Sequence, residues 1–398
     1  MADTDAKLKV SELDFDTIKT NLKAYLKSQS EFSDYDFEGS GLSVLLDILA
    51  YNTNYMGYYL NMVANEMFID TALTRKSVVS HAKLLGYTPR SVVASRASIN
   101  VAFTPVTNDA NSSITIPRFT RFISESKDGV NYIFVTTSTR IVSKNNSTGL
   151  FNVEKLEIKE GQPIAVTFTY NSQNNPKQIF ELPEANIDTS TIQVRVQKSV
   201  ENANQDSYLL SQDATDVGAN SAVYYIEENK NGKYQIYFGD GIIGKKLTNG
   251  NIVIVSYIVS SGLTANGLKL FKLVDTVLPG STNAITLDQE SSSGAPAEDI
   301  EKIRFAAPKA YIAQNRAVTK NDYIALIMRD YPYFEAVNIW GGEENDPPIY
   351  GKVFFTAKPL GGYEISATEI EYVKNSIIKP FSVLTVQPEY VAADYQGI

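Results

Sequence analysis

A short glycine-rich stretch, YFGDGIIGKKL from Tyr237 to Leu247, has the residue types of a nucleotide-binding turn. Gly239, four further residues, Gly244 and Lys245 reproduce the spacing of a phosphate loop. Such a loop cradles phosphates with backbone N–H groups, places a Lys on the terminal phosphate and a Ser or Thr hydroxyl on Mg²⁺, and opens a helix. Lys246 stands where that hydroxyl is needed, so the magnesium ligand is missing.

The residues around this stretch favour a structural turn over a nucleotide site. The run YQIYF at 234–238 reads as a strand, LTNG at 247–250 is a second turn signal, and NIVIVSYIV at 251–259 is β-branched. Glycine accepts positive φ without steric cost, so Asp-Gly is typical of a tight hairpin. We interpret four residues as a structural turn and expect no cofactor: Gly239, Asp240, Gly241 and Gly244.

Composition excludes several other kinds of chemistry. The 398 residues contain no Cys and one His, which argues against disulfides, thiolate or multi-His metal sites and most acid–base designs. The net charge of −9 opposes nucleic acid and anionic membranes, and no apolar run is long enough to span a bilayer. His81 borders the apolar face of a predicted helix and is interpreted as a packed residue. We predict no catalytic residues and no metal site.

Clustered carboxylates leave two further site hypotheses. An acidic loop at 341–348 carries Glu343, Glu344 and Asp346, but the spacing matches no calcium loop, and we interpret it as solvated. Acidic pairs at 227–228 and at 299 with 301 are the residue type of a carboxylate hydrolase. They fall at predicted strand ends and helix starts, where exposed caps explain them better.

The first 90 or so residues have helical spacing. A first amphipathic helix spans residues 13–26, a loop with aromatic residues follows at 31–40, and a long helix covers 42–64. A third helix starts at the N-cap Thr74, turns Val78, Ala82 and Leu85 inward, and ends at Gly86.

The long helix carries two apolar stripes and one polar line. The first stripe holds Leu45, Leu49, Met56, Leu60 and Val63, the second holds Val44, Ile48, Tyr51, Tyr55, Tyr59 and Met62, and the remaining line holds Asp47, Asn54, Gly57 and Asn61. Such a helix needs cover on two sides. Either its own domain supplies the cover or another chain does. The residues predicted to form an assembly interface are Leu22, Tyr25, Leu45, Ile48, Leu49, Tyr51, Tyr55 and Tyr59.

From about residue 95 the hydrophobic period changes to two. Strand-like runs stand at 97–103, 113–117, 132–135, 153–158, 164–168, 192–196, 223–226, 234–238 and 252–259. Polar turns separate them, which predicts antiparallel sheet in one or two β-domains. The run SSSGAPA at 291–297 has the composition of a flexible linker.

The remainder predicts a small mixed domain. A helix at 298–307 is expected to break near Pro308, and strands are expected at 337–340 and 353–357. A last helix is expected from Ser366, with Glu369 completing a capping box, and to stop before Pro380. Another helix is expected to begin at Thr319 in the run TKNDYIALIM, where Thr319 and Asp322 form a capping box. The turn and cap motif NRAVTKNDY contributes Arg316, Thr319, Asp322 and Tyr323.

Three stretches, in this order, resemble a known family. They are 39–89 (GSGLSVLLDILAYNTNYMGYYLNMVANEMFIDTALTRKSVVSHAKLLGYTP), 238–267 (FGDGIIGK and NGNIVIVSYIVSSGLTANG) and 303–327 (IRFAAPKAYIAQNRAVTKNDYIALI). Together they look like the larger wedge subunit of contractile-tailed phage baseplates of the T-even type, and the second and third are similar to the broader baseplate J-like family. The resemblance covers most of the chain and is weakest from about 105 to 220.

The resemblance implies a structural role in the virion. Family members pack as pairs in each wedge of the tail baseplate, and the wedges form a ring around the tail tube that switches conformation. The N-terminal helices are expected to join a bundle with a second copy and with a small sheath-initiating subunit. The C-terminal region is expected to contact a neighbouring copy. Assembly is expected to take place in the host cytoplasm. T-even members usually continue beyond the point where this chain ends.

The residues and the resemblance together predict an α+β, multi-domain protein. We expect a helical N-terminal region at 1–92, an antiparallel β-rich middle at 93–290 and a small mixed α+β domain at 291–398. The leading functional hypothesis is a non-enzymatic assembly subunit without nucleic-acid binding or membrane insertion. The alternative is a β-rich tail or adhesin protein that binds a receptor or glycan.

Overall fold

The computed structural model describes residues 14–28, 40–106, 111–211, 217–229, 231–313, 316–331, 334–359, 365, 367–383 and 385–393. The chain forms two compact units. One runs to Leu85 and includes Ile300–Phe305, and the other comprises Gly86–Asp299 and the residues from Ala306 onward. N-terminal helices, a β-rich middle and a mixed C-terminal region confirm the predicted α+β class. The domain boundaries at 92 and 290 stay predictions.

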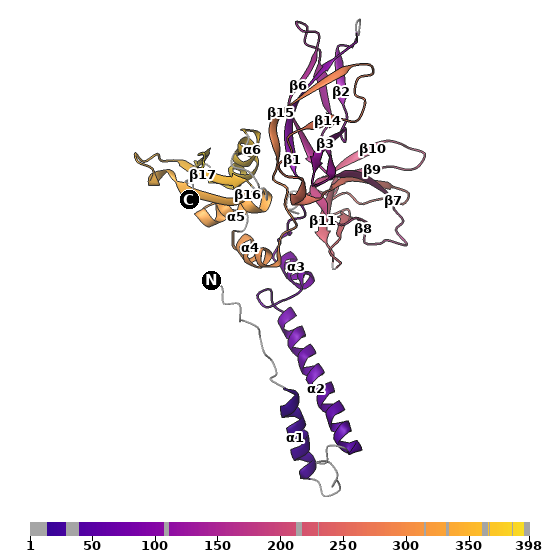
Figure 1. Cartoon of the computed structure of the whole chain (residues 1–398), viewed down its shortest axis with the longest axis vertical. Coiled ribbons are helices and arrows are strands. Elements are labelled where there is room, and N and C mark those ends of the chain that lie inside the picture. Colours follow the sequence, from indigo (N-terminus) through magenta and orange to yellow (C-terminus); the bar gives the residue numbers. More distant parts are fainter. Residues whose placement is uncertain are drawn as a thin grey trace. The chain divides into compact units, whose positions relative to one another are not determined.

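Three helices form the N-terminal part, as the apolar spacing predicts. They are α1 (Phe15–Lys27), α2 (Gly41–Glu66) and α3 (Arg75–Leu84) (Figure 1). The hydroxyl of Ser40 caps α2 by accepting from the N–H of Ser43, and Thr74 caps α3. Gly86, at φ +73°, follows α3 in the left-handed conformation that ends many helices. Of the predicted loop at 31–40, all but Ser40 lies outside the described residues.

Helices α1 and α2 pack side by side as an antiparallel hairpin. Ile18 of α1 is buried, and the ammonium of Lys19 lies 2.6 Å from the carboxylate of Asp47. The helices have 13 and 26 residues. At about 1.5 Å per residue, α1 is about 20 Å long and α2 about 39 Å. Helix α1 therefore pairs with only part of α2.

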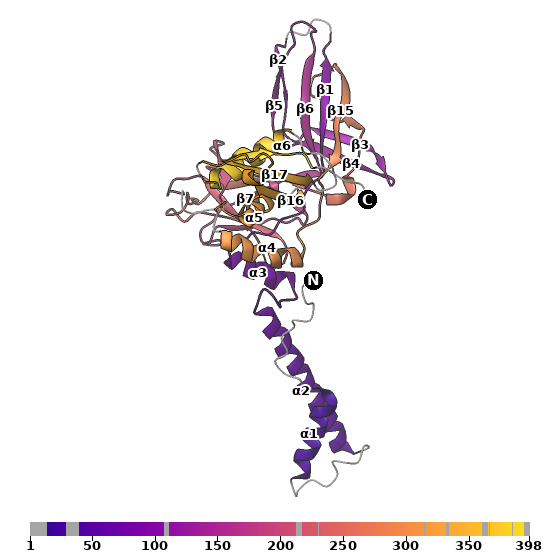
Figure 2. The same cartoon turned by 90° about the vertical axis from the view of Figure 1, so that its left-hand side faces the viewer.

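A six-stranded antiparallel sheet begins the second unit. Its order is β14-β3-β4-β6-β1-β15. The strands are β1 (Arg96–Thr104), β3 (Arg121–Lys127), β4 (Val130–Thr136), β6 (Phe151–Glu160), β14 (Phe271–Leu273) and β15 (Thr282–Ser292). Figure 2 shows β6, β1 and β15 next to one another, and β2 (Ser113–Ile116) pairs with β5 (Arg140–Ser143) as a separate ribbon. Alternate residues of β1 are buried, and Phe103, Phe122 and Phe134 lie in the core of this sheet.

A seven-stranded sheet is the second sheet of the middle region. Its order is β7-β13-β9-β10-β11-β12-β8. The strands are β7 (Gln162–Thr169), β8 (Ile179–Glu181), β9 (Ile187–Gln197), β10 (Gln205–Leu210), β11 (Val223–Glu228), β12 (Tyr234–Phe238) and β13 (Ile252–Val259). All pairs are antiparallel except β10 with β11. Its core surrounds Tyr257, Val253 and Ile236, which are fully buried.

The chain crosses between the two sheets at two places. Strand β6 ends at Glu160 and β7 begins at Gln162, so Gly161 is the only residue between them. Strand β13 returns through Ser260, Ser261 and the short 3-10 helix η1 (Gly262–Ala265) towards β14. These crossings set the geometry of the buried site described below.

The predicted linker at 291–297 is wrong. Ser291 and Ser293 are each 1% exposed and Ala295 is 2% exposed. The N–H of Val93 donates to the carbonyl of Ala295, and the N–H of Ala295 donates back. A run of small residues packs here because close backbone pairing leaves no room for larger side chains.

The C-terminal part is a three-stranded sheet covered by helices. It contains α4 (Ile300–Ala313), α5 (Lys320–Asp330), β16 (Phe334–Gly341), η2 (Gly342–Glu344), β17 (Lys352–Pro359), α6 (Ala367–Tyr372), the π-helix η3 (Val373–Ile378), α7 (Lys379–Phe381) and β18 (Gln387–Tyr390). The strand order is β16-β17-β18, with β17 and β18 parallel. The two strands predicted at 337–340 and 353–357 are confirmed as β16 and β17.

Two helix ends were predicted wrongly, both at prolines. Helix α4 continues through Pro308 to Ala313, although Pro308 donates no backbone hydrogen bond and its ring crowds the carbonyl of residue 304. The last helix continues past Pro380 to Phe381 by widening into the π-helix η3. Ser366, its predicted cap, lies outside the described residues. The Glu369 carboxylate accepts from the hydroxyl of Tyr331.

Candidate assembly surface and buried polar joint

The stretch that resembles a phosphate loop is a turn closed by its own aspartate. Asp240 Oδ1 accepts from the N–H of Ile242 at 2.8 Å and from that of Ile243 at 3.0 Å. These backbone hydrogen bonds lower the pKa of Asp240, with that from Ile243 the larger cause. The N–H of Gly241 donates to the carbonyl of Gly244. The backbone donors that would cradle a phosphate thus already hold a carboxylate, and strand β13 follows instead of a helix.

Glycine is required at two positions of this turn for two different physical reasons. Gly241 has φ +95°, a conformation that residues with a side chain rarely adopt. Gly239 has an ordinary φ, but a Cβ there would lie 2.3 Å from the carbonyl carbon of Gly244. Lys245, which would reach a phosphate in a nucleotide site, lies with its ammonium 2.8 Å from the carboxylate of Asp206.

We predict that Gly239→Ala lowers the free energy of unfolding by about 1–3 kcal/mol, because overpacking forces the backbone apart. The measurement is chemical denaturation of the purified chain. Gly218→Ala is the matched control, since its Cβ would meet nothing nearer than 3.9 Å. Equal stability of the two variants would contradict the close approach of Gly239 and Gly244.

The NRAVTKNDY motif opens helix α5. Thr319 Oγ1 accepts from the N–H of Asp322, and the Asp322 carboxylate accepts from the N–H of Thr319 at 2.8 Å, which completes a capping box. Tyr323 is 4% exposed in the core of the C-terminal part, and burial raises its pKa. Arg316 is exposed and precedes the cap. Thr319 and Asp322 therefore shape the start of α5.

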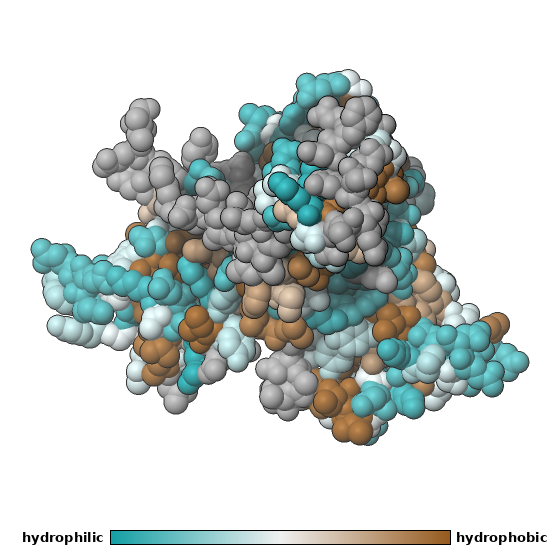
Figure 3. Space-filling model, turned by 90° about the horizontal axis from the view of Figure 1, so that it is seen from below, coloured by the Kyte–Doolittle hydropathy of each residue, from teal (hydrophilic) through white to brown (hydrophobic). Residues whose placement is uncertain are grey.

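Helix α2 presents most of its apolar side chains to solvent. Seven of the eight residues predicted for the interface are more than 40% exposed, from Tyr55 at 42% to Tyr25 at 66%, and Leu22 is half-buried. We call the exposed set on and just after this helix the α2 apolar surface. It consists of Val44, Leu45, Ile48, Leu49, Tyr51, Tyr55, Met56, Tyr58, Tyr59, Leu60, Met62, Val63 and Met67. Figure 3 shows hydrophobic side chains, in brown, on the surface of the molecule.

Of the predicted small and polar line of α2, Gly57 is buried, and Asp47, Asn54 and Asn61 are partly buried. Ser43, Leu46, Ala50, Gly57 and Asn65 are the buried residues of this helix. At about 100° per residue, the α2 apolar surface spans about 200° of the helix circumference. A surface helix of a globular protein typically has an apolar stripe of about 100°. Both apolar stripes are therefore exposed among the residues that the structure describes.

Tyrosines order part of this surface. The Tyr51 hydroxyl donates to that of Tyr55 at 3.0 Å, and their rings meet edge to face at 4.6 Å. The rings of Tyr55 and Tyr59 lie 6.1 Å apart. The hydrogen bond to Tyr51 raises the pKa of Tyr55. Large rings with few rotamers and a polar tip suit a protein interface.

Within the described parts of the chain, neither a membrane span nor a metal cluster is found. No described helix is long and apolar enough to cross a bilayer. No group of three or more His, Cys, Asp or Glu side chains among the described residues is placed to hold a metal ion. In the loop at 341–348, the Glu344 carboxylate accepts from the ammonium of Lys320 at 2.6 Å.

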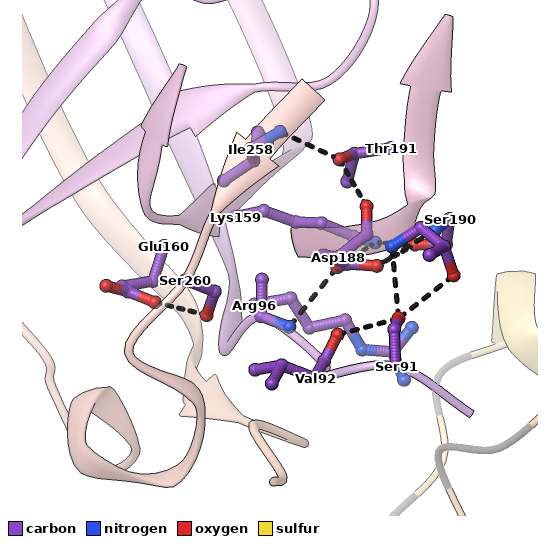
Figure 4. Close-up of polar contacts among 12 residues, drawn as sticks. Ser91, Val92, Arg96, Lys159, Glu160, Asp188, Ser190, Thr191, Ile258 and Ser260 are labelled. Atoms are coloured by element: carbon purple, nitrogen blue, oxygen red, sulfur yellow. Dashed lines mark hydrogen bonds and ion pairs between the residues drawn. The ribbon is translucent and has the colours of Figure 1, made fainter. Parts of the chain in front are cut away.

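A buried polar joint lies where the chain crosses between the two sheets (Figure 4). We define it by Ser91, Lys159, Glu160, Asp188, Ser190, Thr191 and Ser260. Asp188 is 1% exposed and accepts from the N–H of Ala94 and from the N–H and hydroxyl of Ser190. The Lys159 ammonium lies 3.5 Å from Asp188 and donates to Ser190 Oγ at 3.0 Å. The joint fastens β6 to β9 with a satisfied ion pair.

Glu160, the last residue of β6, connects the first crossing to the second. It is 3% exposed and accepts from the hydroxyl of Ser260 at 2.6 Å and from the N–H of Ser261 at 3.1 Å. Burial raises its pKa, while these hydrogen bonds act in the opposite direction. A raised carboxyl pKa is a property of general acids. These carboxyls are enclosed by protein and serve to join β6, β9 and the residues after β13.

We predict that Glu160→Gln changes the pH dependence of stability. Because the folded chain holds the Glu160 proton at higher pH than the unfolded chain, the free energy of unfolding falls as pH rises from the ordinary value of 4.5 through the raised pKa. The free energy of unfolding stays lowered at pH values above the raised pKa of Glu160. The amide cannot ionise, so the variant gains stability relative to the parent as pH rises from 4 to 8. Thermal melts across this range measure the difference, and parallel curves would contradict it.

Sequence reasoning missed the polar joint. Its residues come from positions 91, 159–160, 188–191 and 260, which no local pattern connects. The one available signal is the pair Lys159-Glu160 at the end of an otherwise alternating strand. Charged residues in such a position are usually exposed.

Comparisons with known proteins bear on both ends of the chain. Residues 14–87 match the family model "Baseplate wedge protein gp6-like, helical domain". Residues 319–391 match "Baseplate structural protein gp6, C-terminal domain I". The chain is 30% identical over 408 residues to baseplate wedge protein gp6 of Enterobacteria phage T4, covering 96% of this chain. These matches support a baseplate wedge family.

The match to the T4 wedge protein is partial in length, since the chain spans 59% of that relative. The helical domain match contains α1, α2 and α3, and therefore the whole α2 apolar surface. The second match begins at the α5 cap Thr319 and extends beyond β18.

Two solved structures are also similar. One is the cryo-EM structure of the anti-feeding prophage baseplate, at TM-score 0.29 and 12% identity, covering 96% of this chain and 80% of that chain. The other is the type VI secretion system TssK-TssF-TssG baseplate subcomplex, at TM-score 0.31 and 8% identity, covering 77% of this chain and 89% of that chain. Similarity at this level carries no inference for this chain.

Proposed function

We propose that this chain is a structural subunit of a contractile-tail baseplate wedge, working in the virion as paired copies in the ring around the tail tube. The observation that carries the proposal is the α2 apolar surface. The single chain leaves this surface exposed, and it lies within the residues that match the baseplate wedge helical domain.

The need for more than one partner follows from the extent of the surface, and the resemblance to baseplate wedge subunits suggests which partners these are. Apolar side chains over about 200° of helix circumference cannot be covered by one neighbouring helix. Helix α1 already occupies the opposite side of α2, through Ile18 and the Lys19–Asp47 ion pair. We propose that α2 of a second copy and a helix of a small sheath-initiating subunit pack on the two stripes. Assembly in the host cytoplasm and a part in the conformational switch of the baseplate belong to the same proposal.

No enzymatic step is part of the proposed function. The carboxylates that suggested a hydrolase have other partners, since Glu227 accepts from the side-chain amide of Gln235 and Glu301 pairs with Arg304. Glu160 and Asp188 are enclosed in the polar joint. The relative with 30% identity is named as a baseplate wedge protein.

Sedimentation velocity tests the proposal on the purified chain, alone and mixed with the other wedge proteins of its phage. We expect a self-associating chain that forms larger, stoichiometric complexes only in the mixture. A monomer at tens of micromolar that ignores the other wedge proteins would overturn the proposal.

A further inference from the structure

The last helix widens immediately before a proline. In the π-helix η3 the N–H of Lys379 donates to the carbonyl of Lys374, five residues earlier. In an α-helix the ring of Pro380 would clash with the carbonyl of residue 376, four residues before it. The wider turn before Pro380 relieves this clash.

The burial pattern of η3 fits the wide register. Val373, Ile377 and Ile378 are at most 1% exposed, at positions i, i+4 and i+5. In an α-helix, consecutive residues such as Ile377 and Ile378 point about 100° apart. A turn closed by i to i+5 hydrogen bonds instead brings these positions towards one face. A change to α-helical register would rotate α6 relative to this buried face.

An ion pair joins helix α6 to the six-stranded sheet. The Glu369 carboxylate pairs with the guanidinium of Arg96 on β1, and the two side chains are 12% and 13% exposed. The Tyr331 hydroxyl lies between them, accepting from Arg96 Nη1 at 2.8 Å and donating to Glu369 Oε1 at 2.6 Å. We call Arg96, Tyr331 and Glu369 the latch.

The ring of Tyr331 depends on the same helix. It packs at 4.9 Å from Phe334 and at 5.7 Å from Tyr372, the last residue of α6. Glu369 and Tyr372 are three residues apart and so lie on one face of α6. A rotation of α6 would therefore remove both the carboxylate and the ring contact from Tyr331 together. Figures 1 and 2 show α6 beside β17.

We propose that α6 and η3 form a two-state register switch, in which the π-helical state closes the Arg96–Glu369 latch and the α-helical state opens it. Opening turns α6 and frees the C-terminal part from its ion pair to β1. Packed elements change between discrete arrangements more readily than they deform continuously. The switch is built into this fold and goes beyond the assembly role proposed above.

Electron spin resonance distances between two labels test the switch in the isolated chain. The chain contains no Cys, so Asn131→Cys on β4 and Glu371→Cys on α6 carry the only labels. Both positions are exposed. Three variants are compared with the labelled parent. Pro380→Ala restores an N–H and removes the ring clash, Arg96→Met removes the latch charge, and Lys352→Met breaks the Lys352–Glu389 pair elsewhere in the same part.

One distance peak is expected for the labelled parent and for Lys352→Met. Pro380→Ala and Arg96→Met are each expected to add a second, discrete peak at the same new distance. A single unchanged peak in both variants would overturn the switch. A broad distance distribution in Arg96→Met, without a second peak in Pro380→Ala, would also overturn the switch. Such a result would mean that α6 becomes loose without adopting a second helical register. Should Arg96→Met not fold, Pro380→Ala, at an exposed site, decides alone.

Discussion

Replacing Leu49 by Asp is expected to abolish wedge assembly while leaving the isolated chain folded. Leu49 is 53% exposed in the single chain, so the carboxylate meets water there and costs little. In the proposed bundle the same carboxylate is buried against apolar side chains without a partner, which costs several kcal/mol. At 1.4 kcal/mol per factor of ten, assembly affinity falls at least a hundredfold. Tyr55→Asp, at 42% exposure, is expected to act in the same way.

Co-purification with the other wedge proteins and thermal melts of the isolated chain measure the two halves of this prediction. Ile141→Asp on β5 is the matched control, because Ile141 is an aliphatic residue 73% exposed and outside the α2 apolar surface. It is expected to assemble like the parent. Normal complexes with Leu49→Asp would remove the interface role of α2, whereas an unfolded variant would show that Leu49 is packed within its own chain.

Replacing Asp188 by Ala is expected to lower the free energy of unfolding by about 3–5 kcal/mol, the usual effect of breaking one side of a buried ion pair. Lys159 is then left charged and 7% exposed, and the N–H groups of Ala94 and Ser190 lose their acceptor. The change acts on the joint between the two sheets. Denaturant titration with fluorescence detection measures it.

The exposed ion pair of Asp206 with Lys245 provides a comparison for the buried pair of Asp188 with Lys159. Asp206 and Lys245 are each 43% exposed and lie 2.8 Å apart. Asp206→Ala is expected to lower the free energy of unfolding far less than Asp188→Ala, because water screens the exposed pair. Asp188→Asn, which keeps an acceptor oxygen, should fall between the two alanine variants. If Asp188→Ala were as mild as Asp206→Ala, the joint would not hold the sheets together.

The spacing of apolar residues in the sequence predicted those strands that bury only one of their two faces. The runs at 234–238 and 252–259 coincide with β12 and β13, because their inward residues alternate in the sequence. Strand β15 was missed because TNAITLDQESS lies at a sheet edge and most of its side chains are exposed, which leaves no apolar period to detect. The short strands β8 and β14 contain three residues each, too few for a period.

Predictions from short stretches of sequence were wrong where contacts between distant parts of the chain determine the local structure. Small residues at 291–297 suggested a linker, yet their pairing with the segment after α3 needs small side chains. Proline suggested helix ends at 308 and 380, but α4 continues through Pro308 and the last helix continues past Pro380. For α2 the apolar stripes were visible in the sequence, but only the structure showed that α1 packs on the side of α2 that carries Asp47.

The most direct test of the central claim is hydroxyl-radical footprinting of the chain alone and in the assembled wedge, read by mass spectrometry at Tyr55, Met56 and Tyr59. All three are at least 42% exposed in the single chain and should react readily there. The account predicts that assembly lowers their modification rates at least tenfold. Rates in the wedge equal to those of the isolated chain would mean that no other chain covers α2, and would contradict the account.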